Sequence, residues 1–95
     1  MGSNGEDMGM SAAWISGTET VTASKNLVAQ QLISLQSNGG AVEISYQRPM
    51  QQISRRVIKP LRIFRKSGMH VMYVEAYCET RSETRIFELS WMTIP

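Results

Sequence analysis

The spacing of apolar residues predicts a helical segment followed by strands. In the first segment apolar side chains recur at intervals of three and four residues, which is the period of one helix face. That face contains Leu27, Val28, Gln31, Leu32 and Leu35. Thr22 or Ser24 can cap its start, and Ser37-Asn38-Gly39-Gly40 can end it, because glycine accepts the left-handed conformation past the last turn. We therefore predict one α-helix over about residues 24–37.

From residue 41 onward the period changes to two, which is the period of a strand. Val42, Ile44 and Tyr46 alternate with polar residues, and Pro60 should bend the second strand because it has no N–H for the ladder. The later strands are predicted at about 55–66, 69–79, 84–89 and, as a short piece, 90–95. A short chain can best hide its strand edges by closing the sheet. The predicted fold class is mainly β: a small antiparallel barrel of about five strands over residues 41–94, preceded by one helix.

Length and composition indicate a single domain. Residues 1–11 are rich in Gly, Ser, Asn and Met without periodicity, so we interpret them as a flexible leader or an artificial remnant, and residues 12–95 as the domain. The single cysteine, Cys78, excludes an intrachain disulfide and a cysteine-based zinc site. No apolar run reaches membrane-spanning length. A cytoplasmic protein without a membrane partner is expected.

The formal net charge of +2 conceals an asymmetry between the two parts of the chain. Residues 1–40 carry one lysine against three acidic residues, a net of −2, whereas residues 41–95 carry nine Lys or Arg against five Glu, a net of +4. The strand region is therefore the part that would attract a phosphate-bearing partner.

Much of this charge lies in residues 48–66, which contain seven basic side chains and no acidic one. They are Arg48, Arg55, Arg56, Lys59, Arg62, Arg65 and Lys66. One interpretation is a solvated strand face that keeps a sheet edge from aggregating. Edge protection needs only one or two lysines, however, and the guanidinium fork of arginine suits bidentate contacts to phosphate. Both interpretations stay open at this point.

Aromatic residues and one further arginine complete the set of binding candidates. Tyr46, Tyr73 and Trp91 can stack on bases or fill the interior of the barrel. Arg85 alternates in register with Phe87, so its stem should be partly buried. It either forms an ion pair, with Glu75 or Glu43, or lines a ligand pocket.

Catalytic and metal chemistry are not indicated. His70 has no second histidine or cysteine nearby that would complete a metal site. The serines of the strand region have no credible base partner beyond this one histidine. We expect no enzyme activity, no metal and no cofactor.

Four sequence motifs, in order, resemble the WYL-domain family of bacterial proteins. The strand Met72-Tyr73-Val74-Glu75-Ala76-Tyr77-Cys78 and the strand Arg85-Ile86-Phe87-Glu88-Leu89 carry the resemblance. Ile44-Ser45-Tyr46 and Arg56-Val57-Ile58-Lys59-Pro60-Leu61 resemble its earlier strands, so that the similarity runs from about Val28 to Ile94. Met72 and Val74 replace the family's Trp and Leu, and Leu89-Ser90-Trp91-Met92 replaces its Leu-Asp-Arg-Ile.

The resemblance implies a small Sm-like (SH3-type) β-barrel after a helix. It also implies ligand sensing or nucleic-acid binding inside larger bacterial regulators, helicases or phage-defence proteins, with single-stranded DNA or oligonucleotides as typical ligands. We therefore expect a non-catalytic domain that binds single-stranded nucleic acid or an oligonucleotide. The candidate binding residues are Tyr46, Arg48, Arg56, Lys59, Arg62, Tyr73, Arg81, Arg85 and Trp91. The alternative is a protein-interaction or oligomerisation module that docks a partner protein or a second copy.

Overall fold

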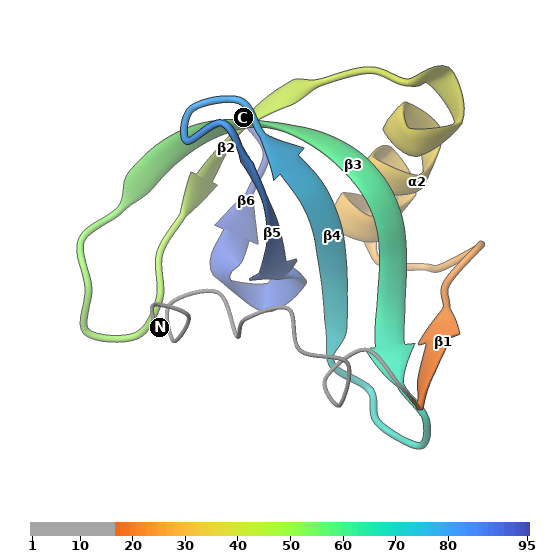
Figure 1. The fold of residues 1–95 in the computed structure, drawn as a ribbon. Coiled ribbons are helices and arrows are strands. Elements are labelled where there is room, and N and C mark those ends of the chain that lie inside the picture. The colour runs from red at the N-terminus through yellow and green to blue at the C-terminus, as the bar shows by residue number, and fades with distance from the viewer. Residues whose placement is uncertain (1–16) are drawn as a thin grey trace.

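Six antiparallel strands and one α-helix make up residues 17–95, the part of the chain that this computed structural model describes (Figure 1). The elements are β1 (Thr18–Thr20), α2 (Leu27–Asn38), β2 (Val42–Tyr46), β3 (Ser54–Lys66), β4 (Met72–Cys78), β5 (Glu83–Glu88), the 3₁₀ turn η2 (Leu89–Trp91) and β6 (Met92–Thr93). The prediction of a mainly β fold with one helix is confirmed. The predicted leader, residues 1–11, lies outside the described residues.

The strands form one sheet in the order β5-β4-β3-β2-β6, and β1 pairs with the end of β3. Figure 1 shows β3 and β4 as long curved strands, with α2 beside β3. The order and the small size are compatible with an Sm-like domain. There are six strands rather than about five, because the sequence pattern gave no signal for the three residues of β1.

The prediction of a closed barrel is wrong. β5 and β6 lie at the two ends of the strand order and do not pair with each other within the described residues. After β5 the chain turns through η2, and the two residues of β6 pair only with Ser45 and Tyr46 of β2. Within residues 17–95 this leaves no strand that could pair with the free edge of β5. The sheet is therefore curved but open.

Helix α2 begins later than predicted, and its buried face keeps Leu32 from the predicted set but excludes Leu27. Asn26 is the N-cap, where Thr22 or Ser24 was expected, and its Oδ1 accepts a hydrogen bond from the Ala29 N–H at 3.0 Å. The buried side includes Ala29 and Leu32, whereas Leu27 is 73% exposed. The predicted helix end is confirmed, because Gly39 has a φ of 68°.

A bulge divides β3 into two halves. Even-numbered side chains point to the core in the first half, and this alternation is reversed in the second half. The register shifts between Pro60 and Arg62, so Leu61 has no partner in β4. Before the bulge Arg56, Ile58 and Pro60 are buried, whereas after it Ile63 points to the core. A bulge adds one residue to the alternation of side chains. Residues 56 and 62, which a regular strand would place on one face, therefore lie on opposite faces.

The hydrophobic core lies between the concave face of the sheet and α2. Val74, Ala76 and Cys78 of β4 are fully buried there, in line with the alternation of apolar residues along this strand, and Cys78 is a free thiol. Leu32 and Ala29 of α2 pack into the same cluster. Among residues 17–95, no helix is long and apolar enough to cross a membrane.

Candidate ligand-binding site

A small pocket lies at one end of the curved sheet, where β2, β3 and β5 converge. Its volume is ≈ 30 Å³. Its walls come from these three strands and from the loop that joins β2 to β3, and the lining residues are Tyr46, Arg48, Gln51, Gln52, Ser54, Arg56, Arg85 and Phe87. Three arginines from different parts of the fold thus meet in one pocket, and the lining residues that the structure describes include no acidic residue.

Arg56 is the most deeply placed of the three arginines. It lies opposite Ile44 in the β2–β3 ladder, and its place in the strand alternation points it to the concave face. Only 8% of the residue is exposed. Its guanidinium carbon lies 5.6 Å from the centroid of the Phe87 ring, a cation–π contact that compensates part of the cost of burial.

Two donor groups in the pocket lack a protein acceptor. The Nε atoms of Arg48 and Arg56 are buried and have no hydrogen-bond partner within the described part of the chain. A buried donor without an acceptor costs about 1–3 kcal/mol relative to its hydrated state. An anion that entered the pocket would accept from these groups and remove that cost.

Arg85 approaches the pocket from the opposite side. It lies opposite Ala76 in the β4–β5 ladder, and its side chain is only 14% exposed. The guanidinium forms an ion pair with Glu83 of the same strand, whereas the sequence analysis named Glu75 and Glu43. One arginine of the pocket is thus partly neutralised at the rim, while Arg48 and Arg56 have no such carboxylate among the ion pairs of the described residues.

Tyr46 forms the floor of the pocket and connects two strands that do not pair. Its hydroxyl accepts a hydrogen bond from the Glu88 N–H at 2.9 Å. Its ring makes an edge contact with Phe87, with 5.0 Å between the centroids. Burial, together with the nearby Glu88 charge, raises the pKa of Tyr46 to about 12, despite the opposing effect of the hydrogen bond from Glu88. The tyrosine is therefore a neutral, buried wall and not an exposed stacking surface.

Trp91 lies beside the pocket and borders a second, larger groove. The guanidinium carbon of Arg48 lies 5.7 Å from the centroid of its ring. The groove has a volume of ≈ 190 Å³ and is lined by Ser45, Gln47, Ile53, Ser90, Trp91 and Thr93. Arg48 thus joins the arginine pocket to a groove that contains an aromatic ring.

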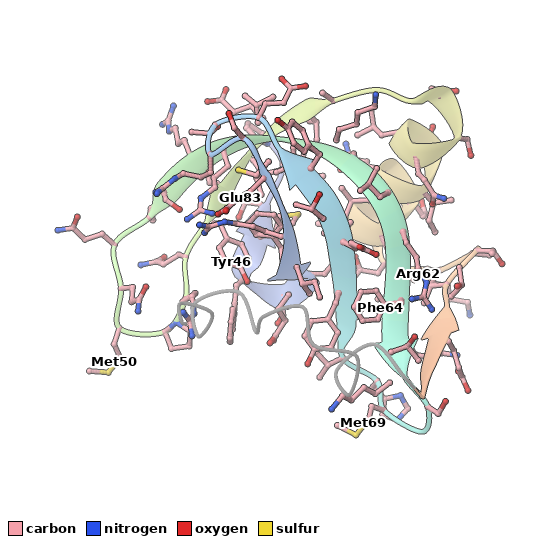
Figure 2. The ribbon with its side chains drawn as sticks, viewed as in Figure 1. Tyr46, Met50, Arg62, Phe64, Met69 and Glu83 are labelled. Atoms are coloured by element: carbon pink, nitrogen blue, oxygen red, sulfur yellow. The ribbon has the colours of Figure 1, made fainter. Side chains whose placement is uncertain are left out.

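Four predicted site residues lie elsewhere. Arg62 and Tyr73 are on the convex side of the sheet, because the β3 bulge moves Arg62 there. Arg62 lies over the Phe64 ring at 5.1 Å and donates hydrogen bonds to Thr18 and Thr20, and Tyr73 stacks on the same ring. Figure 2 shows Arg62 and Phe64 beside β1, well away from Tyr46 and Glu83. Lys59 and Arg81 are exposed and do not line the pocket.

Several lining residues were not predicted from the sequence. Gln51 and Gln52 belong to the connection between β2 and β3, Ser54 is the first residue of β3, and Phe87 entered the prediction only through its alternation with Arg85. The sequence offered one indication that this segment lines the site, namely its position between the two basic residues Arg48 and Arg56. Its polar side chains become lining residues because the antiparallel pairing of β2 with β3 brings its two ends together.

Comparison with known proteins identifies the family of this chain. A family model described as the WYL domain matches residues 30–94. The chain belongs to the WYL domain family. No curated protein matches the chain.

A solved structure has a similar fold. The chain resembles proteasome accessory factor B/C (PafBC) of Arthrobacter aurescens, with a TM-score of 0.63 and 21% sequence identity. The alignment covers 87% of this chain and 14% of that chain. This WYL domain therefore has the size of a small part of that protein, and the similarity at this identity concerns the fold.

Proposed function

We propose that this WYL domain is a non-catalytic ligand-binding module that takes single-stranded nucleic acid or an oligonucleotide at the arginine pocket. Arg48, Arg56 and Arg85 contact phosphate, and Trp91 in the adjoining groove stacks on a base. Stacking of this kind contributes about 1–3 kcal/mol per base. The proposal assigns no contact to Lys59, Arg62, Tyr73 or Arg81.

The burial of Arg56 is the observation that carries the proposal. Arg56 is only 8% exposed as a residue, and its buried Nε has no acceptor among the described residues, so keeping this charge inside the protein lowers the stability of the fold. Edge protection, the competing interpretation of the basic stretch, needs exposed charges. A buried arginine that shares a pocket with two others fits a phosphate site better.

The lining of the pocket supports binding without catalysis. The hydroxyl of Ser54 donates to the Tyr46 carbonyl oxygen at 3.3 Å, and among residues 17–95 the lining includes no histidine or carboxylate that could act as its base. The family and the partial coverage of PafBC favour a role within a larger bacterial regulatory or DNA-processing protein. Cytoplasmic location stays a prediction.

A titration with an internally labelled, eight-residue oligothymidylate tests this function. We expect binding by the wild-type chain, and a loss of about tenfold or more for Arg48→Gln, because a charge-assisted contact is worth about 1.5–3 kcal/mol. Arg65→Gln is the matched control. It removes the same charge from an exposed side chain that pairs with Glu19 outside the pocket. Equal losses for the two variants would contradict the proposal.

A protein-interaction role is the second candidate, and the open edge of β5 favours it. Residues 83–88 pair with β4 on one side and have no strand partner on the other within the described residues. Such an edge can accept a strand from a partner or a second copy. Size-exclusion chromatography with light scattering distinguishes the two roles: a stable dimer that forms without nucleic acid would favour the second.

A further inference from the structure

The arginine pocket has the charge and the size of a site for the end of a nucleic-acid strand. This inference rests on the proposed function and specifies which phosphate of the ligand the pocket recognises. An internal phosphodiester carries one negative charge and two substituents. A terminal phosphomonoester carries about −1.5 to −2 charges at neutral pH, three strong acceptor oxygens and one substituent.

The charge of the pocket matches the phosphomonoester. Three guanidinium groups line it, and Glu83 at the rim offsets one of them through its ion pair with Arg85. Among the residues that the structure describes, the remaining surplus at the pocket is about two positive charges. A dianion would neutralise this surplus, whereas a monoanionic diester would leave one arginine uncompensated in a largely buried place.

The size of the pocket leads to the same ligand group. A volume of ≈ 30 Å³ has room for about two or three oxygen-sized groups, which is the outer part of one phosphoryl group and neither a sugar nor a base. The buried residues Tyr46, Arg56 and Phe87 close the bottom. Both sugar substituents of an internal phosphodiester would have to leave the pocket through its single opening. A terminal phosphate has only one sugar substituent and needs room for one bond to leave.

The groove beside Trp91 can hold the nucleotide that follows the terminal phosphate. Arg48 lines the pocket and also lies over the ring of Trp91, which lines the groove, so one side chain contacts the walls of both spaces. The groove, at ≈ 190 Å³, is about six times the volume of the pocket. We infer that the pocket binds the terminal phosphomonoester of a single strand, with the first nucleotide in the Trp91 groove.

Competition experiments with the full chain test this assignment. An internally labelled, 5′-phosphorylated octathymidylate serves as the probe. The competitors are unlabelled octathymidylates with a 5′-phosphate, with a 3′-phosphate and with hydroxyls at both ends, together with thymidine monophosphate and inorganic phosphate. We expect one phosphorylated strand to compete at least tenfold better than the hydroxyl strand. Because the second pKa of a phosphomonoester is about 6, this advantage should shrink as the pH falls from 7.5 to 5.

The variants separate end recognition from general charge attraction. Arg48→Gln changes a half-buried loop residue and should remove the advantage of the phosphorylated strand, whereas the exposed Arg65→Gln should keep it. Equal competition by all three strands would overturn end recognition and leave nucleic-acid binding intact. Equally good competition by thymidine monophosphate or inorganic phosphate would assign the pocket to free phosphate compounds and overturn the strand assignment. Absence of binding by every strand would overturn the proposed function as well.

Discussion

The hydroxyl of Tyr46 accepts a hydrogen bond from the backbone N–H of Glu88 at 2.9 Å and so joins β2 to the end of β5, two strands with no ladder between them. The edge contact between Tyr46 and Phe87 adds a second link across the same gap. Side chains thus hold the curved sheet together where strand pairing does not close it. The same two rings form the bottom of the arginine pocket, so stability and the candidate site depend on one contact.

Tyr46→Phe tests the contribution of this link. The substitution keeps the ring and leaves the half-buried Glu88 N–H without its acceptor, which should lower the free energy of unfolding by about 1–3 kcal/mol. Urea denaturation measures the change. Tyr77→Phe removes a hydroxyl from a residue that is 38% exposed and should cost less than about 0.5 kcal/mol. Equal effects of the two substitutions would show that the Tyr46–Glu88 bond contributes nothing special.

Alkaline pH tests the burial of Tyr46 independently. Its pKa is about 12 in the folded chain and 10.0 in the reference state, so the unfolded chain loses this proton first as the pH rises. The stability contributed by the neutral tyrosine is therefore complete below pH 10 and is lost between about pH 10 and 12, up to about 3 kcal/mol. The difference in unfolding free energy between wild type and Tyr46→Phe should shrink over that interval. A difference that stays constant would contradict the burial.

Met50→Gly should stabilise the chain. Pro49 and Met50 occupy the centre of a turn in which the Gln51 N–H donates to the Arg48 carbonyl oxygen at 3.1 Å, and Met50 has a φ of 64°. Figure 2 shows Met50 at the tip of its loop, pointing away from the rest of the protein. Glycine adopts this backbone conformation without the steric cost of a Cβ atom, and no packing is lost, so we expect a gain of about 0.5–1 kcal/mol.

The neighbouring position provides the control for this turn. Gln51→Gly adds the same backbone freedom at a residue that is not among those with positive φ, so it should destabilise the chain by about 0.5–1 kcal/mol. Thermal unfolding of both variants measures the two changes. A loss of stability in Met50→Gly would show that the methionine side chain makes a contact worth more than the strain of its backbone.

Arg56→Met distinguishes a functional arginine from a structural one. Methionine can occupy the space of the aliphatic stem and removes a buried guanidinium whose Nε has no acceptor among residues 17–95. We expect the free energy of unfolding to rise by about 1 kcal/mol while oligonucleotide binding is lost. Chemical denaturation and a binding titration on the same preparation measure both quantities. A strongly destabilised variant would assign Arg56 to the fold and not to the ligand.

The strands with regular alternation could be predicted from the sequence. In β2 the buried residues are Ile44 and Tyr46, and in β4 they are Val74, Ala76 and Cys78, as their period of two predicts. Gly39 could be predicted as the helix end for a local reason, since a left-handed residue favours glycine. In each of these cases the conformation of a residue is determined by residues close to it in the sequence, so the local pattern is enough to predict it.

The features that could not be predicted depend on contacts between distant segments. The bulge at Leu61 reverses the facing of the second half of β3, and this separates Arg62 from Arg56 although both belong to one basic stretch. Asn26 caps α2 in place of Thr22 or Ser24, and the core contacts of Ala29 and Leu32 leave Leu27 exposed. The pocket itself depends on the curvature that brings Phe87 of β5 against Tyr46 of β2, and no local pattern carries that information.

The salt dependence of oligonucleotide binding tests the arginine pocket most directly. For single strands, each phosphate contact contributes about 0.7 to the slope of log affinity against log salt concentration. We predict a negative slope of about −1 to −2 for the wild-type chain, a slope weaker by about 0.7 for Arg48→Gln, and no change for Arg65→Gln. A wild-type slope near zero, or the same change in both variants, would contradict phosphate binding at this pocket.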